Sequence, residues 1–515
     1  MKRIAIVAIA LGMAVLAVPS VMANGDNGPN VAPTTVVLGA DNPLIDVPAV
    51  QSAVDQGGTV ILRGKFDFGV DAGNHIIVPG RPYPDQDVKG KSTVFIYQKD
   101  VTIIGETGKH GALLTVVKNG MPPFWIGWDG ETYRNPPSGT ENVDFGRETF
   151  PQDSQGRISY RDTGDEIGYL GSQTRYARAF QNVSATIKNI YFDSPKHYGV
   201  KATAGRDVIL VGNVFSKVQF GGLVHINNPL GPGTGTSGAT HIAAGFLGIS
   251  LAYAPFVYPA ITGKIDAEQN LVDDVGTDPT VNTHSGECFG LGALFTNAAV
   301  TIQQNEIRNI GRQMNGLGPD VWASSIVLVD NYTASPLVAQ NIVYNSSFIG
   351  IWDLAALPPP PPGPPLSPGP KIEGNTVSDC ALTGIWSDSS ILASIVGPRE
   401  GGLIDKNSIS QDSLLGSGQS CIKADFLSAC SITRNSFSGT FSGGLVQLGS
   451  SNNCTLLMNK DQRKSIPSGS PTYILDRYSP DSPYSSGNLI KGSSGTAVDN
   501  GTNNTISLPP RGGKQ

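Results

Sequence analysis

The feature of this sequence that most limits its fold is an asparagine that recurs just after a short apolar stretch. Examples are VAQNIV around Asn341, IEGNTV around Asn375 and IDKNSI around Asn407. Apart from one gap of 57 residues, successive members lie 24 to 36 residues apart. The full series is Asn189, Asn213, Asn270, Asn305, Asn341, Asn375, Asn407, Asn435 and Asn459. A unit that repeats at this length is typical of a chain that stacks structural repeats.

Each repeat reads as a short strand, a sharp bend and a second short strand. Asparagine tolerates the left-handed backbone conformation that a bend needs, and its side chain hydrogen-bonds nearby backbone. Long helical patterns are missing between the strands, which excludes βαβ units. One repeat cannot bury its apolar face alone, so successive turns must stack as parallel strands about 4.8 Å apart. The sequence predicts one column for Asn341, Asn375 and Asn407, and this register disfavours the alternative of an asparagine-rich β-sandwich.

The series resembles the right-handed parallel β-helix of the pectate-lyase-like superfamily. The segment IDVPAVQSAVDQGGTVILRGKFDFG, residues 45–69, resembles the opening motif of that superfamily, in which a short amphipathic helix caps the first coil. Ala49, Val50, Ala53 and Val54 have the spacing of the buried face of such a helix. The fold that the resemblance implies is an all-β, single-stranded right-handed parallel β-helix over residues 41–506, followed by a tail at 507–515. Insertions are expected near 119–180 and 227–262, with a proline-rich loop at 358–370.

The first 23 residues have the pattern of a secretory signal peptide. Lys2 and Arg3 precede an apolar run, and small residues lead to a cleavage site after Ala23. We therefore expect a secreted or periplasmic protein with a flexible segment at 24–40. A net charge of −6 and the absence of a basic cluster argue against a nucleic-acid partner. No later apolar run is long enough for a membrane span, and we expect a monomer.

Two of the five cysteines occupy equivalent places in adjacent repeats. Cys430 and Cys454 each lie five residues before an asparagine of the series. We expect buried thiols here in preference to a disulfide, because stacked parallel strands hold the two side chains in poor bridging geometry.

The sheet that corresponds to the polysaccharide-binding sheet of the superfamily has two open registers. Its expected strands are the segments that begin at Gly199, Gly222, Gly350, Gly384, Cys421 and Gly444. If the residue after glycine faces inward, Trp352 and Trp386 project outward and form a platform for sugar rings. If the second residue after glycine faces inward, the tryptophans are core. The outward column is then His225, Asp353, Ser387 and Gln447, while Lys201 and Lys423 need a local shift. The second register accounts better for the polar residues and favours a packing role for the tryptophans.

Acidic residues recur near the edge of this sheet at Asp330, Asp353, Asp388 and Asp425. Asp388 and Asp425 each lie three residues after an aligned isoleucine, so we expect them to be neighbours. Two carboxylates at strand spacing raise the pKa of one of them or hold a hard cation such as Ca²⁺. A pair about 5 Å apart also serves retaining glycoside hydrolysis. The alternative is a solvated turn with two ordinary aspartates.

Two functional hypotheses follow from these patterns and from the resemblance. One is a carbohydrate-active protein, a lyase or a hydrolase that acts on an extracellular or envelope polysaccharide, with Ca²⁺ allowed as a cofactor. The other is a non-catalytic protein that binds through the same elongated surface. The catalytic candidates are Asp353, Asp388 and Asp425. The sugar-binding candidates are Trp352, Trp386, Lys423 and His225. Motifs of polygalacturonases, pectin methylesterases and pectate lyases do not match. Convergence of the three aspartates beside an arginine or lysine is what separates the hypotheses.

Overall fold

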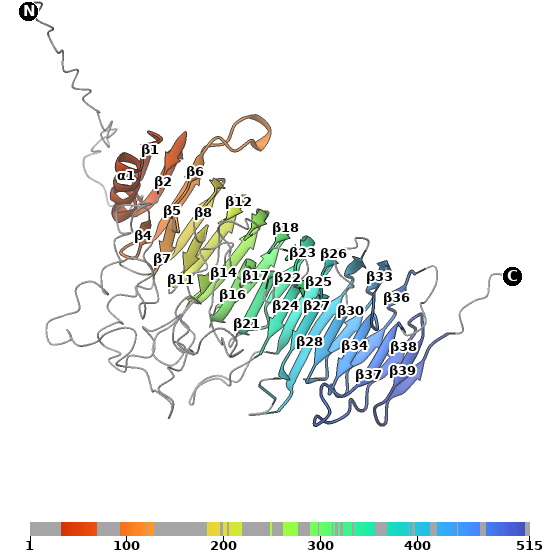
Figure 1. The fold of residues 1–515 in the computed structure, drawn as a ribbon. Helices are drawn as coiled ribbons and strands as arrows, with labels where there is room; N and C mark the ends of the chain where they lie inside the picture. Colours follow the sequence, from red (N-terminus) through yellow and green to blue (C-terminus); the bar gives the residue numbers. More distant parts are fainter. Residues whose placement is uncertain are drawn as a thin grey trace, which may run out of the picture.

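The chain forms a stack of parallel coils closed at its N-terminal end by one helix (Figure 1). The computed structural model describes residues 32–69, 93–120, 122–127, 183–195, 199–202, 205–218, 248–249, 261–276, 289–296, 298–311, 313–314, 318–319, 323–331, 334–355, 368–390, 392–393, 397–411, 420–439, 441–463 and 470–509. The expected signal peptide, most of both insertions and most of the proline-rich loop lie outside these residues. Among the described residues, no helix is long and apolar enough to cross a membrane.

Strands from successive coils pair in parallel, so each face of the stack is one long sheet. Within the described residues the first face holds fifteen strands. Fourteen follow one path, and β31 (Leu427–Ser428) pairs with β28 at its side. The path is β1 (Thr34–Leu38), β2 (Gly58–Arg63), β5 (Val101–Gly105), β8 (Ala185–Lys188), β11 (Gly205–Val211), β14 (Ile261–Glu268), β17 (Ala299–Gln303), β22 (Leu337–Ala339), β25 (Gly369–Glu373), β28 (Arg399–Asp405), β32 (Ser431–Thr433), β35 (Thr455–Leu457), β38 (Leu489–Lys491) and β40 (Thr505–Ser507).

The second face takes the next strand of each coil, and the third face takes the strand after that. In the described residues the second face is an eleven-stranded sheet of β3 (Lys65–Asp67), β6 (Val116–Lys118), β9 (Tyr191–Asp193), β12 (Val214–Val218), β15 (Leu271–Val275), β18 (Glu306–Ile310), β23 (Ile342–Ser346), β26 (Thr376–Cys380), β29 (Ser408–Gln411), β33 (Ser436–Gly439) and β36 (Lys460–Asp461). The third face has two parts. A four-stranded sheet holds β4 (Val94–Ile96), β7 (Phe124–Ile126), β10 (Val200–Ala202) and β13 (Gly248–Ile249). An eight-stranded sheet holds β16 (Phe289–Thr296), β21 (Ser324–Asn331), β24 (Ile349–Leu354), β27 (Thr383–Asp388), β30 (Ser420–Asp425), β34 (Val446–Gly449), β37 (Tyr473–Asp476) and β39 (Ala497–Asp499).

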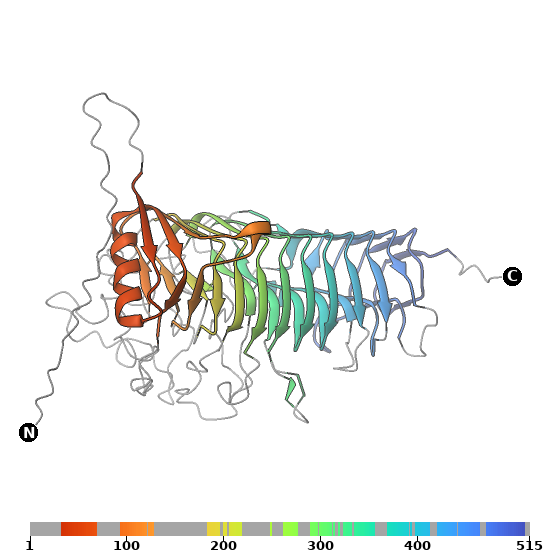
Figure 2. The same ribbon diagram turned by 90° about the horizontal axis from the view of Figure 1, so that it is seen from above.

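These sheets make the right-handed parallel β-helix that the sequence predicted. Figure 2 shows the coils side by side, from the N-terminal helix at the left to the C-terminal end at the right. Among the described residues, the 3-10 helix η2 (Lys109–Gly111) and the antiparallel strands β19 (Gln313–Met314) and β20 (Gly318–Pro319) lie outside the coil faces.

The asparagines form a continuous hydrogen-bonded column, as predicted. Asn341 Nδ2 donates to Asn375 Oδ1 at 3.0 Å, and Asn375 Nδ2 donates to Asn407 Oδ1 at 2.9 Å. The same bond links each pair along Asn213, Asn270, Asn305, Asn341, Asn375, Asn407, Asn435 and Asn459. Each side chain also donates to a backbone carbonyl of the preceding coil, for example Asn341 to Ile302 at 2.9 Å.

Two details of the asparagine prediction were wrong. The left-handed residue of the bend is the one before the ladder asparagine, such as Gln304 (φ 55°) or Gln340 (φ 56°). Asn189 is itself left-handed (φ 58°), and the backbone N–H of the next residue, Ile190, donates to Asn213 Oδ1 at 3.1 Å, so Asn189 stands one place outside the column. Each asparagine of the column directs both its backbone N–H and its side chain along the column. The residue before it therefore adopts the left-handed conformation that the bend needs.

The N-terminal cap is helix α1 (Pro43–Gln56), and its buried face matches the prediction. Val50, Ala53 and Val54 are buried, and Ala49 packs against the core. Asn42 caps the first turn by accepting from the Leu44 backbone N–H at 3.0 Å. The buried Asp46 carboxylate accepts backbone N–H bonds from Ala40, Asn42 and Asp67, which ties the helix to β3.

Part of the segment expected to be flexible, residues 24–40, is a strand. β1 (Thr34–Leu38) pairs in parallel with β2 and extends the first sheet by one strand beyond the expected first coil. The β-branched residues of TTVVL favour a strand, and Val37 points into the core.

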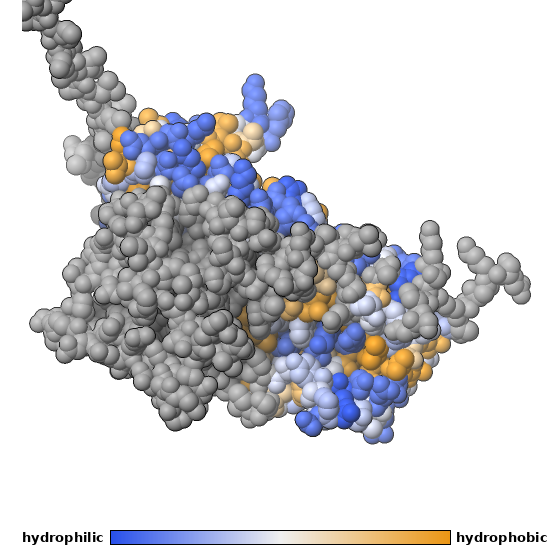
Figure 3. Space-filling view, in the orientation of Figure 1, coloured by the Kyte–Doolittle hydropathy of each residue, from blue (hydrophilic) through white to orange (hydrophobic). Residues whose placement is uncertain are grey.

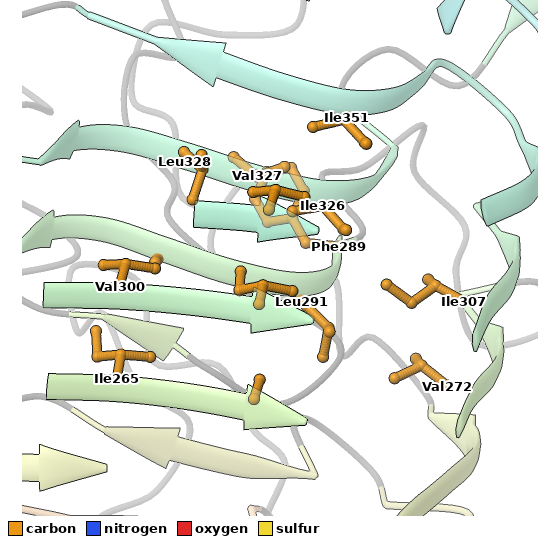
Figure 4. Close-up of a cluster of buried hydrophobic side chains, with 14 of the residues drawn as sticks. Ile265, Val272, Phe289, Leu291, Val300, Ile307, Ile326, Val327, Leu328 and Ile351 are labelled. Carbon is orange, nitrogen blue, oxygen red and sulfur yellow. The ribbon is translucent and has the colours of Figure 1, made fainter. Parts of the chain in front are cut away.

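The interior of the coil is apolar. Figure 4 shows Ile265, Leu291 and Ile307 reaching from different faces into the same space, and these side chains are fully buried. Cys430 and Cys454 belong to this core as free, buried thiols, one rung apart, as expected.

Candidate functional site

On the eight-stranded sheet the residue after glycine faces inward, which is the first of the two registers considered above. Ile351, Ile385 and Ile422 are in register and fully buried, so they point into the coil. The residue after each must point outward. We call the resulting series the outer column: Trp352, Trp386, Lys423 and Gln447. The second register, which sequence reasoning favoured, is wrong.

The two tryptophans nevertheless pack, as the sequence suggested, and do not form a platform. Their ring centroids lie 6.2 Å apart at an interplanar angle of 27°. Phe348 and Trp352 form an edge-to-face pair with ring centroids 6.3 Å apart; Trp352 is 4% exposed, while Trp386 stays half-buried. In-register side chains stack along the axis of the coil, so the ring faces point toward neighbouring rungs. A sugar ring therefore finds ring edges here, and no open face.

Asp353 lies on the inner side of the sheet, away from the other two aspartates. Its register neighbours beyond Ser387 are Ala424 and Leu448, both core residues. Arg399 Nη1 donates to both carboxylate oxygens, at 3.1 and 2.9 Å, and Ser387 Oγ donates at 2.8 Å. With both partners of the ion pair nearly inaccessible, Asp353 is placed to stabilise the coil and not to meet a substrate. Its predicted outward position was wrong.

Asp388 and Asp425 are neighbours, as predicted, and stand directly in register on β27 and β30. Asp425 Oδ2 accepts a hydrogen bond from Trp386 Nε1 at 2.8 Å and pairs with Lys423 Nζ at 3.1 Å. Burial raises the pKa of Asp425 to about 7; the Lys423 ammonium opposes this rise and the nearby Asp388 adds to it. Burial also raises the pKa of Asp388, against a hydrogen bond from the Ser390 backbone N–H at 2.8 Å. The pair therefore takes up protons far more readily than solvated carboxylates.

Lys423 sits between two aromatic rings. Its Nζ lies 4.2 Å from the centroid of the Trp386 ring and 5.3 Å from that of Tyr478. With the Asp425 carboxylate at its side, the ammonium is held by cation–π contacts and one ion pair. Its side chain keeps 25% of its surface exposed.

A short loop after β37 carries two exposed tyrosines, of which Tyr478 lies beside Lys423. We call residues 477–484 the tyrosine loop. Tyr478 and Tyr484 are 42% and 40% exposed, and Arg477 lies over the Tyr484 ring at 5.1 Å. The loop is tied to the coil by Ser450, whose Oγ accepts from the Tyr478 N–H at 2.9 Å and donates to the Pro483 carbonyl at 2.6 Å. Sequence reasoning missed these residues, although the paired tyrosines of RYSPDSPY, within a turn-rich segment, were the available signal.

The surface around this site mixes polar and apolar residues. In Figure 3, hydrophobic and hydrophilic residues alternate over the C-terminal coils, which carry β34, β37 and β39. Half-buried Gln447 continues the outer column toward Ile474 and then Val498.

The site does not fit a Ca²⁺ ion. Ca²⁺ takes six to eight oxygen ligands, whereas Asp388 and Asp425 supply two carboxylates and the Lys423 ammonium lies 3.1 Å from one of them. In the described part of the chain, no three His, Cys, Asp or Glu residues are grouped to hold a metal.

The remaining sequence candidates lie elsewhere. His225 and the strand expected at Gly222 are outside the described residues, as is the side chain of Asp330 in β21. Lys201 belongs to β10 of the four-stranded sheet, in register with Trp125 and Phe95. Its Nζ lies 4.3 Å from the Trp125 ring centroid, and Trp125 stacks with Phe95 at 6.0 Å. An aromatic pair followed by a lysine thus occurs on both parts of the third face.

Comparison with known proteins finds similar architectures at low identity. No protein-family model matches the chain, and no curated protein sequence matches it. Among solved structures, the Streptococcus pneumoniae surface protein and adhesin PfbA is 12% identical, with a TM-score of 0.42, over 92% of this chain and 97% of that one. The A-module of a mannuronan C-5 epimerase of Azotobacter vinelandii is 12% identical, with a TM-score of 0.38, over 90% and 91% of the two chains. A tailspike protein of E. coli bacteriophage HK620, solved with a hexasaccharide, is 11% identical, with a TM-score of 0.40, over 90% and 76%.

Proposed function

We propose that this protein is exported and binds an extracellular or envelope polysaccharide on the outer face of the eight-stranded sheet, beside the tyrosine loop. The observation that carries the proposal is the Lys423 ammonium between Trp386 and the exposed Tyr478, which stands on an anchored loop. A sugar presents an apolar ring face and a rim of hydroxyl groups. Tyrosine offers an apolar ring with a polar end for the first, and a lysine ammonium supplies three hydrogen-bond donors for the second.

The coil also suits an extended chain. Its rungs repeat at about 4.8 Å, and the outer column continues over several rungs in one register. A polymer laid along the stack would meet Gln447 and Lys423 in successive coils. Export is supported by the pattern of residues 1–23, in which Lys2 and Arg3 precede an apolar run.

Binding is tested with an array of acidic and neutral polysaccharides. We expect the wild-type protein to bind at least one of them and Tyr478→Ala to weaken that binding about tenfold or more, the range of an aromatic anchor at an interface. Tyr191→Ala is the matched control, because Tyr191 is half-buried on a different sheet; it should leave affinity unchanged. Absence of binding to every polysaccharide, or equal losses in the two variants, would contradict the proposal.

Cleavage of the bound polysaccharide is the second candidate function. It is favoured by two adjacent carboxyls whose pKa values burial raises: Asp425, to about 7, which is the range that a general acid needs near neutral pH, and Asp388 in the same direction. The same samples are scored for new reducing or unsaturated ends, with and without Ca²⁺. New ends that disappear in Asp388→Asn would support catalysis, whereas binding without new ends would support the non-catalytic alternative.

A further inference from the structure

The Asp425 carboxylate uses only one of its two oxygens. Trp386 Nε1 and Lys423 Nζ both approach Oδ2, at 2.8 and 3.1 Å. Oδ1 is buried and has no hydrogen-bond partner among the described residues. Asp425 Oδ1 fits at this place because residue 449 is a glycine; the Cβ of any other residue there would overlap Oδ1. A buried oxygen of an ionised carboxylate left without a donor is costly, since burial of a charge requires compensation.

The same geometry accommodates a protonated Asp425 without rearrangement. A proton on Oδ1 leaves Oδ2 free to accept from Trp386 and Lys423 as before. The groups that face Asp425 are the Lys423 ammonium on its own strand, the Trp386 indole and the Asp388 carboxyl on β27, Gly449 on β34 and the Tyr478 ring beyond β37. Lys423 favours the ionised form, while Asp388 and burial favour the protonated form.

We propose that Lys423 binds an anionic group of the glycan and that Asp425 competes with this group for the ammonium. This inference rests on the proposed function and adds the class of ligand, a glycan that carries carboxylates or sulfate esters. When Asp425 is ionised, the Lys423 charge is neutralised within the protein. When Asp425 is protonated, the full positive charge of Lys423 is available at the outer face. Binding of a glycan anion therefore takes up a proton on Asp425.

The pH range of this competition follows from the raised pKa of Asp425, which burial brings to about 7. Uronate carboxylates and sulfate esters stay ionised on both sides of that value, so a change in affinity between pH 6 and pH 8 arises in the protein. If the protonated form is the one that binds the anion, its population falls about tenfold between these pH values. Affinity should fall by up to the same factor.

The experiment measures dissociation constants for a polyuronate, a sulfated glycan and a neutral glycan at pH 6 and pH 8, at one fixed ionic strength because salt screens exposed charges. For the wild-type protein we expect affinity for at least one anionic glycan to be up to about tenfold tighter at pH 6, with no such change for a neutral one. Whichever anionic glycan shows the change in affinity, the polyuronate or the sulfated glycan, identifies the chemical group that Lys423 binds.

Three variants separate the roles. Asp425→Asn mimics the protonated acid and should bind at pH 8 as tightly as the wild type binds at pH 6. Lys423→Met should lose the preference for anionic glycans at both pH values. Asp476→Asn is the matched control. Asp476 is half-buried, pairs with Gly449 on the neighbouring strand and accepts a hydrogen bond from Asn500, so its replacement should preserve the pH dependence. Thermal unfolding shows that each variant is folded.

The outcomes are distinct. Anionic glycans bound with equal affinity at both pH values, or a pH dependence that survives in Asp425→Asn, would overturn the competition while leaving polysaccharide binding intact. Binding of neutral glycans alone would also overturn it. Absence of binding to all three glycans would overturn the proposed function as well.

Discussion

Replacing Asn341 by alanine tests the asparagine column where it is continuous on both sides. The Asn341 side chain makes four hydrogen bonds: Nδ2 donates to the Ile302 carbonyl at 2.9 Å and to Asn375 Oδ1 at 3.0 Å, and Oδ1 accepts from Asn305 N and Nδ2, both at 3.0 Å. At about 1 kcal/mol for each bond, the substitution should lower the free energy of unfolding by about 4 kcal/mol. The substitution also leaves buried groups such as the Ile302 carbonyl without a hydrogen-bond partner, which adds to the loss of stability.

The neighbouring Gln340 provides a matched control. It is exposed, has the left-handed φ of 56° and accepts one surface hydrogen bond from Gln304 at 3.1 Å. Gln340→Ala removes a side chain from the same bend without touching the column, and surface substitutions of this kind usually change stability by about 0.5 kcal/mol or less.

Equilibrium unfolding in urea measures both effects, followed by fluorescence of the buried tryptophans. Both the midpoint and the slope are compared, because a stack of repeats whose coupling is weakened can unfold in parts. A midpoint for Asn341→Ala that lies as close to the wild type as that of Gln340→Ala would refute the reasoning. The hydrogen bonds of the column would then contribute little beyond those that the unfolded chain makes with water.

Three further predictions concern the buried charges. Asp353→Ala leaves the Arg399 guanidinium buried without its partner and should lower the free energy of unfolding by about 3–5 kcal/mol, while glycan affinity stays unchanged. Thermal unfolding and glycan-binding assays measure the two effects. A folded variant that no longer binds glycan would show that Asp353 belongs to the binding site. The pKa of Asp425 is raised on folding to about 7, so its contribution to stability is full at low pH and is lost as pH rises through about 7. Asp425→Asn should therefore lose less stability than the wild type between pH 5 and pH 8, and equal losses would count against the raised pKa. Gly449→Ala places a Cβ against Asp425 Oδ1 and should lower stability at pH 5 and pH 8, whereas unchanged unfolding temperatures would show that the carboxylate moves freely.

The repeated architecture was predictable because its determinants are local. A ladder asparagine and its flanking apolar residues lie within a few positions of each other, and the same pattern returns in every coil. The helical face of Val50, Ala53 and Val54 was readable for the same reason. The left-handed residue was assigned to the wrong neighbour because the asparagine and the residue before it can both occupy the bend. Only the hydrogen bonds of the column show which of the two does so.

The orientation of the third face was not readable from sequence. In GIWDL and GIWSD, an isoleucine and a tryptophan stand side by side, so apolar residues occupy both sides of the strand and alternation does not choose between them. An aspartate then follows Trp352, and a polar residue suggests an outward position. Asp353 instead points inward because Arg399, 46 residues later, neutralises it.

The sequence by itself determined the path of the chain: a strand, a bend and an asparagine, repeated until coils stack. The tertiary structure alone decided which charges are buried together and which meet solvent. Lys423, Trp386 and Tyr478 belong to three different coils, and their meeting depends on the register of the coils and on a loop anchored through Ser450. The energy of a charge depends on every group within a few ångströms, whatever its distance along the chain, and a pattern read along the chain does not contain those distances.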